Sequence, residues 1–309
     1  MQLNYTKVEQ CTIESLGVVE LDVYDIEVED NHNFFANSIL VHNSVYLDCQ
    51  PLVDKICVGK SKEFTVKFLD TFGKTECQKV IDSSIDFIFD KTNAMQKVMG
   101  SKREVIASKA LFRGKKNYAL YIHDSEGVKY DPPKIKVLGI EVVRSSSPQW
   151  CRSRLKDGIK IMFENDELYM RDWFKKASEE FLKLKVEEIS SPKGVSDIDK
   201  WVTSSGYKKG CPMHVRASIL YNTNVTNLKE YRKLFNGDKI KYVYLKLPNP
   251  INENIIGFPT SERLPKEFNL DNYIDYDLQF EKVFRNPLES LTSLAGWSLE
   301  EKSSLEEFF

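Results

Sequence analysis

The sequence predicts a mixed α/β fold. Alternating apolar and acidic residues over 24–29 predict a strand near the N-terminus. Apolar residues at helical spacing over 64–99, and again after residue 148, predict helices. Between these helices, the run 116–122 and the polar turn at 124–127 predict two strands joined by a tight turn. At 309 residues the chain is long enough for two or three domains.

Charge is distributed unevenly along the chain. The net charge of −2 conceals an acidic segment, because residues 1–43 hold one basic and eight acidic residues. Residues 44–309 therefore hold 43 basic and 38 acidic residues, a net charge of +5. A basic partner would be steered toward residues 1–43, whereas the alternative is an acidic face that water solvates.

The cysteines and the hydropathy exclude two classes of protein. The six cysteines lie far apart and form no Cys-x-x-Cys pair, so we expect reduced thiols rather than disulfides or a zinc site. No apolar run approaches the ~20 residues that span a bilayer, and the N-terminus has no signal-peptide core. We therefore expect a cytoplasmic protein with no membrane partner.

The stretch His42-Asn43-Ser44 has the chemistry of a chain that cuts itself. The side-chain amide of Asn43 can attack its own backbone carbonyl and close a succinimide, which breaks the bond to Ser44. His42 can donate a proton to the departing amine, and the hydroxyl of Ser44 can accept an acyl group. A tripeptide of this kind also occurs in ordinary turns.

The preceding residues favour the reactive interpretation. The stretch YDIEVEDNHNFFANSILVHN resembles the two C-terminal blocks of an intein, an all-β, Hint-type domain. In that family, residues at the positions of Asp25 and His32 assist the splicing steps. His42 and Asn43 match the penultimate histidine and the cyclising asparagine, and Ser44 matches the first residue of the downstream protein.

Residues 1–43 are shorter than a whole intein. No first-residue nucleophile and no further hundred or so residues precede them, so the resemblance implies the C-terminal fragment of a split intein. Its N-terminal fragment would arrive on a second polypeptide. The alternative is a decayed scaffold that no longer reacts.

A dense basic run occupies residues 97–118, with the sequence KVMGSKREVIASKALFRGKKNY. It holds seven basic residues and one acid, Glu104, with Phe112 and Tyr118 interleaved. Such a pattern predicts binding to nucleic-acid phosphates, with aromatic side chains packing against sugars or bases. The alternatives are a solvated basic surface and, for Glu104, an ion pair with a neighbouring lysine rather than a metal ion.

The segments after residue 43 resemble family B DNA polymerases of T-even-type bacteriophages. The stretches that carry the resemblance, in order, are SVY, VDKI, KREVIA, GKKNYAL, KVLGIEVVRSSSP, GCPMHVRASILYN, GDKIKYVYL and NPLESLTS. The resemblance implies that residues 44–142 complete an α+β palm, that 143–302 form a mainly helical thumb, and that 303–309 are a tail that binds a sliding clamp.

The resemblance also implies two-metal nucleotidyl transfer from dNTPs to a primer end. Two aspartates hold the Mg²⁺ ions in that family, and neither matches a residue of this chain. Glu104 matches an accessory carboxylate near the metals. Lys102 stands where the family often has an aspartate, which puts the metal role of Glu104 in doubt.

Several residues match positions that contact primer-template DNA in this family. Lys115, Lys116 and Tyr118 match its K-K-x-Y group, which meets the DNA near the primer end. Arg144 matches a basic residue where the palm passes into the thumb.

In the thumb, we expect His214 or Arg216 to contact the DNA backbone. Cys211 and His214 also have metal-ligand spacing, but no second pair accompanies them. Before the first thumb helix, Ser147 is the expected cap and Pro148 the expected first residue.

The last residues carry an apolar stripe. Leu305, Phe308 and Phe309 stand at helical spacing and match the clamp-binding tail of the phage polymerases. The alternative is a tail that packs on its own thumb.

Together these observations predict the C-terminal half of a split, phage-encoded replicative polymerase in the host cytoplasm. Splicing at Asn43 and Ser44 would join it to an N-terminal polypeptide to give a DNA-directed DNA polymerase. The alternative is a non-catalytic DNA- and clamp-binding subunit that acts without splicing.

Overall fold

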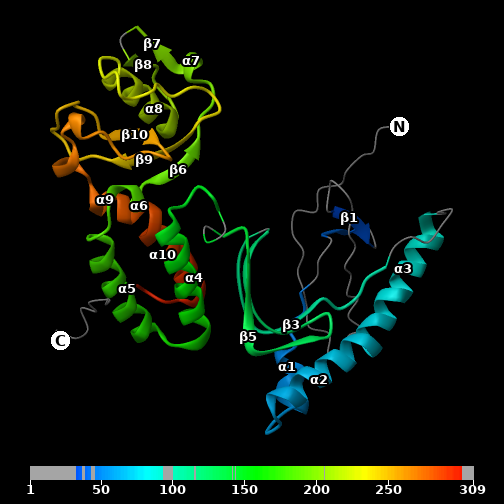
Figure 1. Ribbon diagram of the computed structural model, residues 1–309. Helices are drawn as coiled ribbons and strands as arrows, with labels where there is room; N and C mark the ends of the chain where they lie inside the picture. Colours follow the sequence, from blue (N-terminus) through cyan, green and yellow to red (C-terminus); the bar gives the residue numbers. More distant parts are fainter. Residues whose placement is uncertain are drawn as a thin grey trace, which may run out of the picture. The chain divides into compact units, whose positions relative to one another are not determined.

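The computed structural model describes the backbone of residues 33–36 and 39–42, and residues 46–92, 100–114, 116–140, 142, 144–204 and 206–300. Helices and strands both occur, so the predicted mixed α/β class is confirmed. The described residues form two compact units (Figure 1). Unit 1 holds those up to Ile106 and the segment His123–Tyr130. Unit 2 holds those of Ala107–Ile122 and those from Asp131 onward.

The division into palm, thumb and tail stays a prediction.

In the described part of the chain, none of the helices combines the length and the apolar composition of a bilayer span.

Unit 1 contains a short hairpin before the junction. Strands β1 (Asn33–Ala36) and β2 (Ile39–His42) pair antiparallel, with Asn33 opposite His42. Strand β2 thus ends at His42, the residue before Asn43 in the sequence. The strand predicted over 24–29 lies outside the described residues, and the Hint-type fold stays a prediction.

Helices dominate the rest of unit 1. The expectation of helices over 64–99 is confirmed as far as residue 92 by α2 (Lys62–Phe72), the π-helical η1 (Gly73–Cys77) and α3 (Gln78–Thr92). Helix α2 begins where the hydroxyl of Ser61 accepts a hydrogen bond from the backbone N–H of Phe64 (3.2 Å).

The sequence around Pro51 would suggest a short strand that runs into a turn, and the structure differs on both. The residues after Pro51 belong to helix α1 (Gln50–Ile56). Proline suits the first helical turn, whose N–H groups have no partner within the helix. The strand expected before it is absent over residues 46–49, where Asp48 instead accepts a hydrogen bond from the backbone N–H of Gln50 (2.9 Å).

The predicted pair of strands is confirmed and belongs to a three-stranded sheet. Strands β3 (Val105–Gly114), β4 (Asn117–Ser125) and β5 (Val128–Leu138) lie in the order β3-β4-β5. The central strand β4 is the most buried of the three. Glu126 and Gly127 make the turn with positive φ angles of 51° and 91°, which matches the twist of a tight hairpin.

Arg103 joins two distant parts of unit 1. Its guanidinium contacts Asp70 of α2 at 2.5 Å and Asp124 of β4 at 2.6 Å. The side chains of Arg103 and Asp124 are only 13% and 4% exposed. Asp124 also accepts a hydrogen bond from the N–H of Gly127 (3.0 Å), so the same carboxylate fixes the β4–β5 turn. Low exposure makes these contacts stronger than surface ion pairs.

After its strand segments, unit 2 continues with two helices that confirm the predicted pattern, α4 (Gln149–Glu164) and α5 (Glu167–Phe181). Their buried apolar residues are Cys151, Leu155, Ile159, Met162, Phe163, Met170, Phe174, Ala177 and Phe181. Phe284 packs against Trp150 with ring centroids 5.3 Å apart.

An ion pair joins α4 to α5. Arg154 binds both carboxylate oxygens of Glu180, at 2.7 and 2.6 Å. These hydrogen bonds are the main reason that the pKa of Glu180 lies below its ordinary value.

The expected cap of α4 was wrong. Pro148 occupies the N-cap position with ψ 147°, and no side chain caps the helix. The first turn closes instead through the backbone, because the N–H of Arg152 donates to the carbonyl of Pro148 (3.0 Å). Ser147 therefore lies one residue too early to cap the helix.

A second sheet lies within the region that was expected to be mainly helical. Strands β6 (Ser191–Gly194), β9 (Lys239–Tyr244) and β10 (Ile255–Pro259) pair antiparallel in the order β10-β9-β6. Helix α8 (Met213–Asn224) packs on β10, where a Cβ on Gly257 would lie 3.1 Å from the backbone of Ala217. The short elements here are α6 (Val186–Ile189), α7 (Ile198–Trp201), β7 (Val202–Thr203) and β8 (Gly206–Tyr207).

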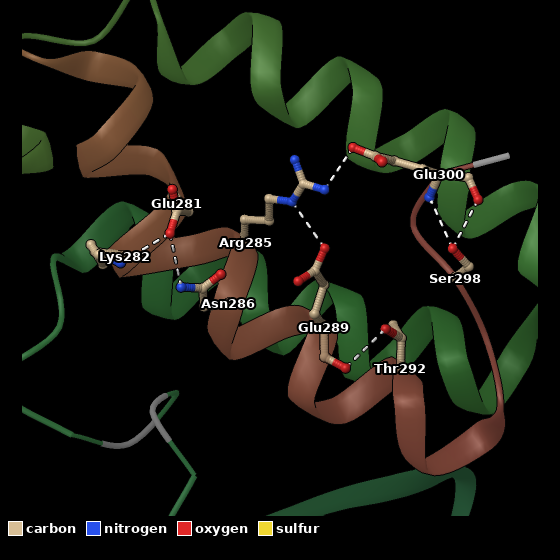
Figure 2. A network of polar contacts seen from close by, with 8 residues as sticks. All are labelled: Glu281, Lys282, Arg285, Asn286, Glu289, Thr292, Ser298 and Glu300. Atoms are coloured by element: carbon tan, nitrogen blue, oxygen red, sulfur yellow. Dashed lines mark hydrogen bonds and ion pairs between the residues drawn. The ribbon is translucent and has the colours of Figure 1, made fainter. Parts of the chain in front are cut away.

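The last described segment is pinned by polar contacts. It comprises α9 (Tyr276–Phe280), the π-helical η5 (Glu281–Arg285) and α10 (Asn286–Thr292). Figure 2 shows Arg285 reaching both Glu289 (2.9 Å) and Glu300 (2.6 Å). Arg171 of α5 donates to the carbonyl of Ser298 (3.0 Å). These contacts hold the chain just before the tail, which itself lies outside the described residues.

The Arg103 network predicts a large stability effect. Arg103→Ala leaves the buried carboxylate of Asp124 without its cation, so we expect a loss of about 3 kcal/mol in the free energy of unfolding. Urea denaturation followed by circular dichroism measures it. Lys79→Ala is the control, because the Lys79–Glu76 pair is exposed and should cost less than about 1 kcal/mol. Equal, small losses in both variants would contradict the network's role.

Candidate nucleic-acid interface

The residues expected to splice lie almost entirely outside the described part of the chain. Asp25, His32, Asn43 and Ser44 are not described. His42 is described by its backbone, as the last residue of β2. The roles assigned to these five residues stay predictions.

The expected DNA contacts begin where the chain enters β4. Lys116 is exposed and has a φ angle of 56°, in the left-handed region that non-glycine residues seldom adopt. Its neighbour Lys115 lies outside the described residues. The carbonyl of Lys116 lies close to Gly139, which follows β5 and has a φ angle of 68°.

The approach between these two residues is close enough to require glycine. A Cβ on Gly139 would lie 1.8 Å from the carbonyl oxygen of Lys116 and 2.8 Å from Oδ1 of Asn117. No side chain fits at such distances, and the positive φ independently favours glycine. The GKKNY stretch and the KVLGIEVV stretch therefore meet, although they are separated in sequence by the β4–β5 pair.

Arg144 joins the same group. Its Nε donates a hydrogen bond to the carbonyl oxygen of Gly139 (3.1 Å), and its side chain is exposed. The structure thus brings two sequence-predicted cations, Lys116 and Arg144, against the same glycine. We call Lys116, Gly139 and Arg144 the glycine-centred group. Two exposed cations held by backbone contacts are suited to neutralising successive phosphates.

Tyr118 supplies an aromatic surface next to Lys116. Its ring lies 6.1 Å from that of Phe112 on β3, at an angle of 49°. Phe112 is 45% exposed, which is unusual for so large an apolar side chain and suits contact with a sugar or base.

Not every residue of the basic run is available for DNA. Lys109 donates to the backbone carbonyl of Phe163 at 2.5 Å, and Arg103 is occupied by the two aspartates described above. These two cations have structural roles.

Arg216 and His214 are set in a different environment on α8. The guanidinium of Arg216 lies 5.6 Å from the ring of Tyr207 and donates to Oδ1 of Asn254 at 2.5 Å. Burial, and to a smaller extent the nearby Lys193, lowers the pKa of His214 below its ordinary value. A neutral imidazole attracts phosphate weakly, so His214 is the weaker of the two expected DNA contacts. Its role and that of Arg216 stay predictions.

Glu104 has an exposed side chain, and its carbonyl oxygen accepts a hydrogen bond from the N–H of Glu126 (2.8 Å). Its neighbour Lys102 pairs with Glu126 at 3.6 Å. Among the described residues, no three His, Cys, Asp or Glu side chains gather into a metal site. The described part of this chain therefore does not fit a Mg²⁺ centre by itself.

Two functional candidates escaped the sequence reasoning. Gly139 stood inside a recognised stretch, but its need for glycine comes from a contact with Lys116. Arg152 and Lys156 on α4 line an open pocket, and their four-residue spacing was the signal that placed them on one helical face.

No protein-family model matches the chain. It is 29% identical over 281 residues to a DNA-directed DNA polymerase of Enterobacteria phage T4, covering 86% of this chain and 31% of that protein. It is also 29% identical over 279 residues to a DNA-directed DNA polymerase of Escherichia phage RB69, with the same coverage. A DNA polymerase of Methanocaldococcus jannaschii is 24% identical over 326 residues, covering 93% of this chain and 18% of that protein.

The chain spans about a third of the length of the two phage relatives. The phage and archaeal relatives are all DNA polymerases. Two of the stretches that carried the resemblance, GKKNYAL and KVLGIEVVRSSSP, build the glycine-centred group. The chain is therefore homologous to family B DNA polymerases, over the C-terminal part of the phage proteins.

Proposed function

We propose that this chain is the C-terminal half of a split phage DNA polymerase, joined to its N-terminal half by trans-splicing at Asn43 and Ser44. The observation that carries the proposal is the junction stretch His42-Asn43-Ser44, which follows the intein-like segment and precedes the stretches that resemble family B polymerases. The phage alignments cover 86% of the chain, which supports the polymerase part of the proposal.

The archaeal alignment adds a second support. It covers 93% of the chain, so it extends into residues 1–43. Part of residues 1–43 therefore aligns with the archaeal DNA polymerase. Such an alignment is expected if an intein-like segment can lie within a polymerase chain.

The proposed splicing proceeds in three balanced steps. The hydroxyl of Ser44 first accepts the acyl group of the N-terminal half, forming an ester as the bond to the N-terminal intein fragment breaks. Asn43 then closes to a succinimide. The C–N bond to Ser44 breaks, and the proton lost by the Asn43 amide passes to the departing amine with the help of His42. Finally that amine attacks the ester, and a peptide bond replaces it.

The glycine-centred group would hold the primer-template in the assembled enzyme. Lys116 and Arg144 would neutralise backbone phosphates, and Tyr118 with Phe112 would pack against a sugar or base. Acceptors in the minor groove look much alike for every correct base pair, so a lysine there tests the shape of the pair without reading its sequence.

Magnesium chemistry would belong to the assembled polymerase. When bound, Mg²⁺ would supply stabilisation of the negative charge that develops on the transferring phosphates. The principal carboxylates would come from the N-terminal polypeptide, with Glu104 as an accessory group at most.

The splicing proposal predicts a new covalent product. Mixing the full chain with its N-terminal polypeptide should give a longer ligated chain and a released fragment of residues 1–43 that ends in succinimide, which mass spectrometry detects. Asn43→Ala should abolish both products, because no amide remains to cyclise. The ligated chain should extend a primer with dNTPs and Mg²⁺.

Two other outcomes would overturn this prediction. Failure of the wild-type chain to ligate would favour a decayed scaffold in residues 1–43. Primer extension by the Asn43→Ala chain together with its partner would show that the halves assemble without splicing.

The glycine-centred group predicts salt-dependent DNA binding. Replacing Lys116 and Arg144 together by glutamine should weaken primer-template binding and lower the slope of log affinity against log salt by about 2, since each phosphate contact contributes about 1. Fluorescence anisotropy at several salt concentrations measures the slope. Lys282→Gln, whose cation pairs with Glu281 at 3.0 Å, should leave it unchanged. Identical slopes in all three proteins would remove these two cations from the interface.

The tail predicts binding to a sliding clamp. Replacing Leu305, Phe308 and Phe309 by serine should weaken clamp binding at least tenfold in surface plasmon resonance, because apolar anchors dominate such contacts. DNA binding without the clamp should not change. Ser304→Ala is the control. An unchanged clamp affinity would favour a tail that packs on its own thumb.

A further inference from the structure

An open pocket of about 410 Å³ lies against the first turns of α4. Its lining residues are Val142, Gln149, Arg152, Ser153 and Lys156. Four of them stand on one face of the helix at spacings of three and four residues, and none of the five is acidic. The pocket is therefore basic, and it was absent from every expectation drawn from the sequence.

The two cations of this pocket lack partners. Within the described part of the chain, the side chains of Arg152 and Lys156 make no hydrogen bond or ion pair, and Nε of Arg152 is buried without an acceptor. A buried donor without an acceptor costs about 1–3 kcal/mol, which an anion in the pocket would offset. The pocket therefore favours the binding of an anion.

The other cations of the same helix show that this is not a general property of α4. Arg154 binds Glu180 at 2.6 Å, and Lys160 faces Glu164 at 3.9 Å. Acids of unit 2 thus pair with Arg154 and Lys160, whereas Arg152 and Lys156 at the pocket keep their charge. Selective neutralisation of this kind leaves a defined anion site.

The start of α4 strengthens the site. No side chain caps the helix and no acid stands in its first turn. The free N–H groups and the helix dipole at this end favour an anion. The dipole adds to the charges of Arg152 and Lys156, and it would be weak without them.

The position of the pocket in the chain identifies the anion. Val142, which lines the pocket, lies between Gly139 and Arg144, both of the glycine-centred group. A nucleic-acid strand on that group presents a row of phosphates, and the pocket stands next along the same stretch of chain. An arginine fork matches the oxygens of one phosphate, and a lysine adds a point charge.

We propose that Arg152 and Lys156 form a phosphate subsite that holds the DNA backbone beyond the glycine-centred group. The inference rests on the proposed DNA binding, and it extends the grip from residues 116–144 into helix α4. The subsite acts on the backbone, so it adds affinity that does not depend on base sequence.

The test measures primer-template binding by the full chain across a series of salt concentrations. The Arg152→Gln and Lys156→Gln double variant should bind about tenfold more weakly at fixed salt and should lower the salt slope by about 1. Lys160→Gln, on the same helix but outside the pocket, should match the wild type. Arg152→Lys keeps the charge and should restore most of the slope. Thermal melting by circular dichroism should be nearly alike for all, because the pocket variants remove no described bond and Lys160→Gln removes only the exposed ion pair with Glu164.

The possible results separate the two proposals. A wild-type chain that shows no salt-dependent binding overturns the proposed DNA binding, and the subsite with it. A wild-type chain that binds, with an unchanged slope in the double variant, overturns the subsite alone. A titration with inorganic phosphate at constant ionic strength, followed by tryptophan fluorescence, provides a second arm. Loss of a phosphate response in the double variant with an intact DNA slope would assign the pocket to a free anion and overturn the backbone assignment.

Discussion

The contact between Gly139 and the carbonyl of Lys116 is the constraint on which the candidate interface depends. It removes the side chain at residue 139, since a Cβ would lie 1.8 Å from that oxygen. The carbonyl oxygen of Gly139 itself accepts a hydrogen bond from Nε of Arg144. The close approach thus fixes the backbone from which the Lys116 side chain extends, and the Nε–H bond to Gly139 orients the guanidinium of Arg144. A group that must meet a regular phosphate backbone gains from such ordering, because less conformational entropy is lost on binding.

A different principle operates in unit 1, where charge is used for stability. Arg103 lies between Asp70 and Asp124, and the low exposure of Arg103 and Asp124 makes their pairing strong. Lys74 and Arg103 lower the pKa of Asp70, with the Lys74 hydrogen bond as the largest cause. The native state therefore holds Asp70 ionised to lower pH than the unfolded chain does. Its stabilisation is present above the ordinary pKa of 3.8 and is lost as pH falls through the lowered value.

Local patterns in the sequence predicted the helices α4 and α5 and the pair β4–β5, because periodicity and turn residues act over short distances. Contacts between distant residues escaped prediction. Gly139 needs to be glycine only because Lys116 approaches it. Arg152, Arg154, Lys156 and Lys160 look alike in sequence. Glu180 and Glu164 neutralise two of them, and only the fold shows which. The prediction that Ser147 caps α4 was wrong by one residue, because Pro148 occupies the N-cap position and the helix starts at Gln149.

The two units differ in how complete they are on their own, and this difference bears on the proposed function. Unit 2 has a continuous apolar core and carries both the glycine-centred group and the pocket of α4. In unit 1, helices α1 and α2 bury no residue, and Ile56 and Phe64 are 47% and 43% exposed. Amphipathic helices gain most of their stability from a packed apolar face, so α1 and α2 have unused capacity to pack. If the proposed function holds, the apolar residues exposed on α1 and α2 would pack against the N-terminal polypeptide that brings the metal carboxylates, whereas the described core of unit 2 is buried within that unit.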